Sequence, residues 1–320
     1  MEYTLGLQLS HATEVAAIGA ARAAGFGNKN GADEKAVEAM RNFFNEVDFN
    51  GKIVIGEGER DEAPMLYIGE KVGTGKGKAV DIAVDPLENT NATATLAPRA
   101  IAVLAASEKG GLFHAPDMYI DKLIVGPESI GKVHLDAPVA KNLKAVATAL
   151  DRDIRDLVVV ILDRERNEKY IQETRKVGAR VKLIEDGDLL PGVAVAMKGS
   201  GVHVVMGIGA APEGVMTAAA LRCLKGEMQG RFWPKNKEEE RRLIKMGGNT
   251  KKIYKTEDLA SGKEIMFCAT GVTSGDLLKG VRFFGTGART HSLVMTTISN
   301  KIRFVDTTHV FDKDKIEFRI

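Results

Sequence analysis

The stretch Leu157-Val158-Val159-Val160-Ile161-Leu162-Asp163-Arg164-Glu165-Arg166 is an apolar run that changes abruptly into charged residues. The apolar run has the length of a buried strand, and the residues that follow it predict a helix over 166–177. A helix over 138–150 precedes it, and strand 180–184, helix 189–198, strand 203–206 and a helix after Pro212 follow. Strands separated by helices of this length predict an α/β fold, with a parallel or mixed sheet covered on both faces.

The residues before this alternation have a less regular pattern. Apolar spacing predicts two helices within the first 50 residues, and β-rich runs predict strands over 52–55, 79–84, 100–105 and 118–125. The glycine-rich segment 73–78 lacks the spacing of a phosphate-binding loop, and we interpret it as a hairpin turn. We therefore expect a mixed α+β lobe over 1–137 and an α/β lobe over 138–320.

The charge balance bears on which partners are expected. The 320 residues include 45 basic and 43 acidic ones, a net charge of +2, which argues against a nucleic-acid-binding protein or a polybasic membrane protein. Apolar runs are too short for a membrane span, and the N-terminus lacks a signal-peptide pattern. Cys223 and Cys268 form neither a disulfide framework nor a zinc motif. We expect a cytoplasmic protein without nucleic-acid or membrane partners.

Carboxylates follow three of the predicted strands. Glu57 comes directly after strand 52–55, Asp85 and Glu88 follow strand 79–84, and Glu213 follows strand 203–206. Ligands collect at such strand ends in sheets covered by helices. Converging carboxylates repel one another unless a cation lies between them, and Mg²⁺ prefers oxygen ligands completed by water and phosphate. A single turn carboxylate is more often solvated or a helix cap, but three such clusters favour a divalent metal site.

Groups that suit phosphate and sugar follow the next strands. Arg164 and Arg166 follow strand 157–162, and their guanidinium groups match phosphate oxygens, although both could instead be surface charges paired with acids. Asp186 and Asp188 flank Gly187 after strand 180–184 and could accept hydrogen bonds from sugar hydroxyls. The same three residues could also form an ordinary turn, with Asp188 capping the next helix.

The segment Gly207-Ile208-Gly209-Ala210-Ala211-Pro212-Glu213 leaves a dinucleotide-binding oxidoreductase as an alternative from another class. It begins like the dinucleotide motif G-x-G-x-x-G. However, Pro212 stands at the third glycine position, and Glu213 would point a negative charge at the pyrophosphate. Both departures argue against this alternative.

Taken in order, these motifs resemble the class II, GlpX-type fructose-1,6-bisphosphatases, including the dual fructose/sedoheptulose bisphosphatases of cyanobacterial type. The resemblance runs nearly end to end and lies in segments 56–66, 85–90, 118–122, 163–166, 186–188, 207–214 and 281–284. It implies a layered αβαβα sandwich of the lithium-sensitive sugar phosphatase superfamily. It further implies a cytoplasmic homo-oligomer, a dimer or tetramer, that releases the 1-phosphate of fructose 1,6-bisphosphate in gluconeogenesis with Mg²⁺ or Mn²⁺.

The resemblance also implies site residues. The metal ligands would be Asp33, Glu57, Asp85, Glu88 and Glu213, four of which the strand-end pattern selects independently. The substrate contacts would be Glu88, Asn89, Thr90, Tyr119, Arg164, Glu165, Arg166, Asp186, Gly187, Asp188 and Ala210. Thr90, Asp61 and Lys29 would be needed for catalysis, with Thr90 orienting the attacking water and Lys29 lying against the transferred phosphate.

Two residues depart from the family's pattern. Asn89 stands where glycine is usual; if the turn needs a positive φ, Asn is the best substitute, but its amide would point toward the phosphate. Glu165 stands where proline is common and could pair with the neighbouring arginines. A catalytically silent homologue is therefore a further alternative to the two bisphosphatase activities.

Overall fold

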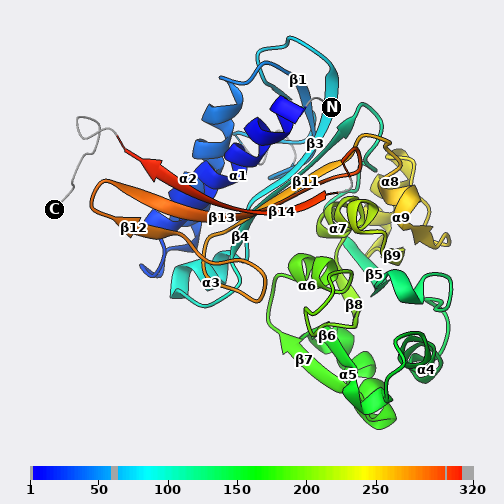
Figure 1. Cartoon of the computed structure of the whole chain (residues 1–320). Helices are drawn as coiled ribbons and strands as arrows, with labels where there is room; N and C mark the ends of the chain where they lie inside the picture. The colour runs from blue at the N-terminus through cyan, green and yellow to red at the C-terminus, as the bar shows by residue number, and fades with distance from the viewer. Residues whose placement is uncertain (1–2, 59–63, 300, 312–320) are drawn as a thin grey trace.

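The computed structural model describes residues 3–58, 64–299 and 301–311 and contains two sheets packed with helices (Figure 1). Helices cover the outer face of each sheet, and further helices lie between the two sheets. The order of layers is therefore helix, sheet, helix, sheet, helix. The predicted α/β class is confirmed.

The larger sheet has eight strands among the described residues, and all its neighbours are antiparallel except β1 and β3. The main order is β12-β13-β11-β4-β3-β1-β2, and β14 pairs with β13. The strands are β1 (Asn50–Ile55), β2 (Lys71–Val72), β3 (Ala79–Glu88), β4 (Ile101–Glu108), β11 (Met266–Gly271), β12 (Arg282–Phe284), β13 (Gly287–Thr296) and β14 (Lys301–Val310).

The smaller sheet is mixed and has the order β10-β9-β5-β8-β6-β7. Strand β6 pairs in parallel with β7 and β8, whereas β5 pairs antiparallel with β8 and β9. Its strands are β5 (Tyr119–Val125), β6 (Val158–Leu162), β7 (Arg180–Ile184), β8 (Val204–Ala210), β9 (Glu227–Trp233) and β10 (Tyr254–Lys255).

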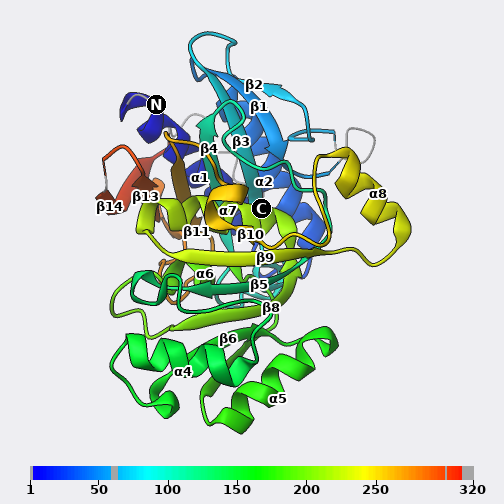
Figure 2. The same cartoon turned by 90° about the vertical axis from the view of Figure 1, so that its right-hand side faces the viewer.

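The helices divide among the layers according to which side chains they bury. Helices α1 (Tyr3–Arg22) and α2 (Lys29–Phe44) cover the larger sheet, and α4 (Val139–Ala149) and α5 (Glu168–Val177) cover the smaller one (Figure 2). Helices α6 (Leu189–Ala194), α7 (Ala211–Leu224) and α9 (Thr256–Leu259) contribute to the core between the sheets. The remaining helical segments are α3 (Thr90–Thr95), α8 (Lys237–Lys245) and three short 3₁₀ turns, Pro127–Ser129, Ile154–Asp156 and Glu165–Asn167.

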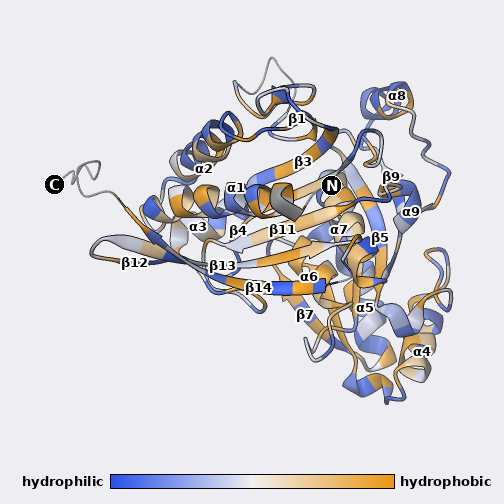
Figure 3. Cartoon of the chain, turned by 45° about the horizontal axis from the view of Figure 1, so that its top comes forward, coloured by the Kyte–Doolittle hydropathy of each residue, from blue (hydrophilic) through white to orange (hydrophobic). Residues whose placement is uncertain are grey.

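The central helix α7 has apolar side chains on nearly every side. Ala218, Ala219 and Leu221 are fully buried, since both sheets pack against this helix. Figure 3 shows the same pattern in colour, with hydrophobic residues on α7 and the central strands and hydrophilic residues on α8. A helix that is apolar all round belongs in the interior of a protein. In the described part of the chain, no helix is long and apolar enough to cross a membrane.

The alternation predicted after residue 137 is confirmed, with differences at element ends. Strand β8 continues to Ala210, and α6 ends at Ala194 rather than near 198. Strand β3 continues past Val84 to Glu88, and its pairing with β4 becomes irregular after Asp85, where Pro86 lacks a backbone N–H. The predicted lobe boundary near 137 stays a prediction; each sheet draws strands from both sides of it.

The hairpin predicted at 73–78 is wrong. Strands β2 and β3 flank β1 on opposite sides, so the segment crosses the end of β1 instead of joining two neighbours. Gly73, Gly75 and Gly77 all have a positive φ. Glycine accepts a positive φ in a crossing loop as readily as in a hairpin turn, so the glycines alone did not distinguish the two.

Candidate active site

The first part of the site forms where β1, β3 and α2 meet. Glu57 follows the end of β1, Asp85 lies at the irregular end of β3, and Asp33 lies on α2. Asp33 and Glu57 line a cavity of about 500 Å³, together with Glu34, Glu38 and Met65. The buried apolar stripe of α2, which includes Ala36, Val37 and Met40, holds the helix against the sheet so that Asp33 faces the strand ends.

The second part of the site lies at the junction of the two sheets. Glu88 ends β3, and Glu213 lies in the first turn of α7. Glu88 is 5% exposed, and its Oε1 accepts a hydrogen bond from the backbone N–H of Leu189 at 3.3 Å. Glu88 and Glu213 line a cavity of about 220 Å³. The packing of α7 between the sheets therefore brings together acids that lie far apart in the sequence.

The negative charges of the five predicted metal ligands act on one another. Burial, and then the charges of Glu213, Glu57, Glu88 and Asp33, hold the pKa of Asp85 well above its usual range. Burial, and then Glu213, raise the pKa of Glu88 in the same way. Asp85 thus connects the two cavities electrostatically.

Two carboxyl groups of the cluster have pKa values close to neutral pH. Burial, with the charge of Asp33, raises the pKa of Glu57 to about 7, and burial raises that of Glu213 to about 7 although Lys122 opposes the rise. Oε2 of Glu213 is buried without a hydrogen-bond partner among the described residues. An oxygen-only donor set with an unsatisfied buried oxygen fits a hard divalent cation.

Two arginines belong to the wall of the smaller cavity. Arg164 and Arg166 line it with Tyr119 and Ala210. The Arg166 guanidinium lies 4.2 Å from the centre of the Tyr119 ring, and its Nε donates to the Ile208 carbonyl at 3.1 Å. Stacking and this hydrogen bond hold the guanidinium in place while leaving other N–H groups available.

Glu165 does not neutralise these arginines. Its side chain is exposed and forms no ion pair with either neighbour in the described part of the chain. Arg164 donates instead to the Asp163 backbone carbonyl at 3.0 Å. The pairing of Glu165 with the neighbouring arginines that the sequence suggested is therefore not found among the described residues.

The loop after β7 provides acceptors at the same cavity. Asp186 is exposed, Gly187 has a φ of +74°, and both line the cavity with Asp188. Asp188 does not cap α6 through its side chain. Its Oδ1 instead accepts a 2.7 Å hydrogen bond from Nζ of Lys122, which is 1% exposed.

Lys122 has no assigned role in the sequence-based prediction. It lies on β5, directly across the ladder from Gly207 of β8. A lysine within a strand usually points to solvent, so its residue type did not suggest a buried role. The sequence feature that could have drawn attention to Lys122 was its place in the motif Met118 to Lys122. Its ion pair fixes Asp188 and also places a positive charge near Glu213.

Asn89 adopts the left-handed conformation that its position suggested, with φ +71° and ψ +57°. Its side-chain oxygen accepts a hydrogen bond from the backbone N–H of Ala92 at 3.2 Å, so Asn89 caps α3. The amide nitrogen points toward Gly187: a Cβ on that glycine would lie 3.5 Å from it. The amide therefore packs between α3 and the Asp186 loop.

Of the remaining candidates, Thr90 and Lys29 do not line either of the two cavities. Thr90 begins α3 and Lys29 begins α2, and these helices pack together; Gly25 and Gly27 also donate backbone hydrogen bonds to α3. Lys29 is exposed and has no ion-pair partner among the described residues. Asp61 lies outside the described residues.

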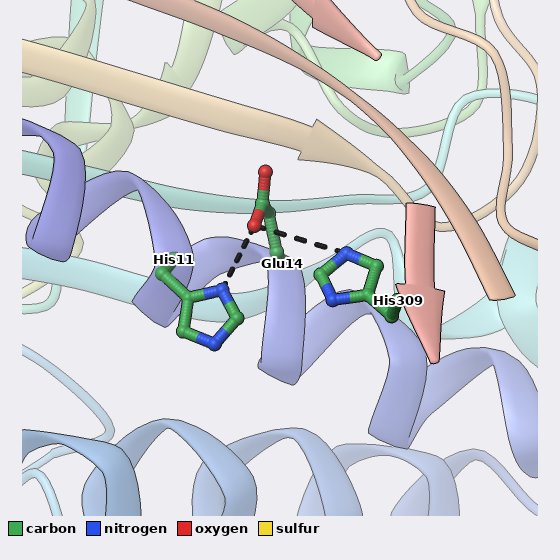
Figure 4. Close-up of side chains that lie close together, drawn as sticks. All are labelled: His11, Glu14 and His309. Carbon is green, nitrogen blue, oxygen red and sulfur yellow. Dashed lines mark hydrogen bonds and ion pairs between the residues drawn. The ribbon is translucent and has the colours of Figure 1, made fainter. Parts of the chain in front are cut away.

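A second cluster of possible ligands lies on the outer side of the larger sheet (Figure 4). Nδ1 of His11 lies 2.9 Å from Oε2 of Glu14, and Nε2 of His309 lies 3.8 Å from the same oxygen; these ligand atoms could hold a metal ion. The other Glu14 oxygen accepts from Thr307 at 2.7 Å, and Nε2 of His309 contacts Thr290 at 2.9 Å. The polar atoms have protein partners, so a hydrogen-bonded link between α1 and β14 accounts for them. Sequence spacing could not reveal it.

Five interacting carboxylates beside a cavity with two arginines are typical of enzymes that act on phosphate groups with the help of divalent cations. Comparison with known proteins gives the family. Residues 3–309 match the model of the bacterial fructose-1,6-bisphosphatases encoded by glpX. The chain belongs to this family, and it is a phosphatase.

Curated relatives match along almost their entire length. A protein of Synechococcus sp. is 50% identical over 337 aligned positions, covering 98% of this chain and 97% of the relative. Proteins of Gloeobacter violaceus (98% and 97% covered) and Synechocystis sp. (99% of each covered) are 48% and 46% identical. All three are named D-fructose 1,6-bisphosphatase class 2/sedoheptulose 1,7-bisphosphatase. Family membership leaves the dinucleotide-dependent oxidoreductase without support.

Proposed function

We propose that the protein hydrolyses the 1-phosphate of fructose 1,6-bisphosphate, giving fructose 6-phosphate and phosphate, with Mg²⁺ or Mn²⁺ as cofactor. The observation that supports this most is the position of Glu88 and Glu213: they belong to the carboxylate cluster and also line the cavity that contains Arg164 and Arg166. A substrate with a phosphate at each end could contact the cluster and the arginines at once.

In this proposal the cations are held by Asp33, Glu57, Asp85, Glu88 and Glu213. When bound, they would supply positive charge to the transferring phosphoryl group and to the oxygens that attack and leave. The unpartnered Oε2 of Glu213 and the raised pKa values of the cluster support this assignment. In the absence of cations, Glu57 and Glu213, each with a pKa of about 7, would be partly protonated near neutral pH.

Arg164 and Arg166 would bind the distal phosphate. Arg166 is already oriented by Tyr119 and by the Ile208 carbonyl, so little side-chain entropy is lost when it binds. Asp186 and Asp188, which flank Gly187, would accept hydrogen bonds from the sugar hydroxyls. Binding at this remote end would orient the 1-phosphate for reaction.

Thr90 would donate or accept the hydrogen bond that orients the attacking water, and Asp61 would polarise it. Lys29 would bind the transferred phosphate; its exposed ammonium has no competing carboxylate within the described residues. Asn89 would help by capping α3, which positions Thr90. Because Asn89 would help to position Thr90, its presence favours an active enzyme over a catalytically silent homologue.

Sedoheptulose 1,7-bisphosphate is the second candidate substrate, because the relatives above carry that activity in their names. We further propose the fold of the lithium-sensitive sugar phosphatase superfamily, supported by the five-layer order and by the segment Asp85-Pro86-Leu87-Glu88-Asn89-Thr90. A cytoplasmic homo-oligomer that serves gluconeogenesis completes the proposal.

The test is a comparison of three substrates with purified, metal-loaded protein. Fructose 1,6-bisphosphate should release one phosphate per sugar and give fructose 6-phosphate, identified by ³¹P NMR. Fructose 6-phosphate itself should be stable, since it lacks the reacting phosphate. Release from sedoheptulose 1,7-bisphosphate at a comparable kcat/KM would establish dual specificity, whereas release from neither bisphosphate would refute the proposal.

A further inference from the structure

A separate cavity of about 390 Å³ lies at the opposite end of the smaller sheet. Its polar wall includes Arg152, Lys198 and His203, and its apolar wall includes Leu150, Val195 and Met197. None of these residues belongs to the proposed catalytic machinery.

Four elements separate this cavity from the catalytic one. Strand β8 begins next to His203 and ends at Ala210 of the catalytic cavity, and β6 runs from Val158 toward Arg164 (Figure 2). Strand β5 and helix α6 run between the same two ends in the reverse direction. Seven strand residues span about 20 Å, so a ligand bound here would not reach the catalytic carboxylates.

His203 faces Arg152 in an arrangement that lacks an acceptor. Nδ1 of His203 accepts a hydrogen bond from the backbone N–H of Val158 at 2.9 Å, so the proton of the neutral ring is on Nε2. That Nε2 lies 3.2 Å from Nη1 of Arg152, and a guanidinium can only donate. Two N–H donors therefore face each other, and an anionic oxygen beside the pair could accept a hydrogen bond from each.

The surrounding charges favour an anion as well. In the described residues, Arg152 and Lys198 have no carboxylate partner, and both are exposed at the cavity. Glu128, the carboxylate of the cavity wall, is exposed and makes no ion pair there. Burial, followed by Arg152 and Arg180, lowers the pKa of His203, although Asp156 opposes this. An anion would relieve the repulsion among these cations.

We propose that this cavity binds a small phosphomonoester at a site distinct from the catalytic one. The phosphate would accept hydrogen bonds from Arg152 and from Nε2 of His203, with Lys198 adding charge. A volume of about 390 Å³ exceeds what a phosphate alone occupies, and the Leu150, Val195 and Met197 side chains offer an apolar surface for the organic part. The site is independent of which bisphosphate the enzyme hydrolyses.

The test follows the His203 ring by ¹H–¹⁵N NMR in the full-length protein, with His203→Gln identifying its signal among those of the six histidines. Titration with glucose 6-phosphate should shift this signal saturably, with a dissociation constant near or below ~1 mM. It should also raise the pKa of His203. Inorganic phosphate should act more weakly, and glucose should have no effect.

Matched arginine variants separate the two cavities. Arg152→Met should raise the dissociation constant at His203 about tenfold, because one charge-assisted hydrogen bond is lost. It should leave kcat/KM for fructose 1,6-bisphosphate within about twofold of the wild type. Arg164→Met should show the reverse pattern. The proposal is wrong if His203 does not respond to glucose 6-phosphate, if Arg164→Met abolishes the response, or if Arg152→Met lowers kcat/KM instead.

Discussion

Removing divalent cations and then raising the pH should destabilise the protein through Glu57 and Glu213. Each has a pKa of about 7 in the folded protein, against an ordinary value of 4.5. A carboxyl group whose pKa rises on folding stabilises the protein below its unfolded pKa, and this stabilisation is lost as the pH rises through the folded pKa. The metal-free protein should therefore lose stability between about pH 4.5 and pH 7.

The magnitude follows from those values. One pKa unit corresponds to about 1.4 kcal/mol, so ionising either buried group costs on the order of 3 kcal/mol of folding free energy. The two groups share partners, so their costs do not simply add. Unfolding entropy of about 2.1 cal/mol/K per residue gives ~0.7 kcal/mol/K for 320 residues. A loss of ~3 kcal/mol thus lowers Tm by roughly 4–5 °C.

The assay is thermal unfolding of chelator-treated protein at pH 4.5 and pH 8, with and without Mg²⁺ or Mn²⁺. Glu213→Gln should remove a large part of the pH-dependent loss, since it deletes one ionisation. Glu238→Gln, at an exposed acid of α8, is the matched control and should behave as wild type. Equal Tm values for wild type at the two pH values without metal, together with no effect of Glu213→Gln, would refute the reasoning.

Substitutions at Thr90, Asn89 and Lys122 test other parts of the site. Thr90→Ala should lower kcat by about 10²-fold or more with little change in substrate affinity, and an equal loss of affinity would rule out a water-orienting role. Asn89→Ala should cost about 2 kcal/mol, because it removes the α3 cap and keeps a positive φ; Asn89→Gly should cost less than ~1 kcal/mol. If denaturant unfolding gave the same loss of stability for Asn89→Ala and Asn89→Gly, the positive φ of residue 89 would not explain the difference. Lys122→Met should destabilise by roughly 3–5 kcal/mol by leaving Asp188 buried and unpaired, and adding Asp188→Leu should restore much of the loss. If Lys122→Met alone lowered the free energy of unfolding only slightly, the buried Asp188 carboxylate would not depend on its ion pair with Lys122.

Local patterns were sufficient for the α/β class and for selecting four of the five carboxylates that the structure brings together, Glu57, Asp85, Glu88 and Glu213. Glu57 and Asp85 could be recognised because each follows an apolar run, and the end of such a run marks a crevice at the edge of a sheet. The conformation of Asn89 could be anticipated because few residues other than glycine accept a positive φ. These inferences depend on neighbouring residues only.

Long-range pairing explains what the sequence left open. Nothing near Lys122 indicates that it meets Asp188, because the contact depends on β8 lying between β5 and β6. The contact between His203 and Arg152 likewise requires β6 and β8 to pair. The hairpin at 73–78 was wrong for the same reason: strand order is set by tertiary packing, and local turn residues fit several orders.

Phosphate release from fructose 1,6-bisphosphate tests most directly the claim that the acidic cluster holds catalytic cations. Chelator-treated wild type should be inactive and should recover on addition of Mg²⁺ or Mn²⁺. Glu88→Gln should lose about 10³-fold or more in kcat/KM under saturating metal, while Glu238→Gln stays at the wild-type rate. Full activity of the chelated protein, or of Glu88→Gln, would contradict the account.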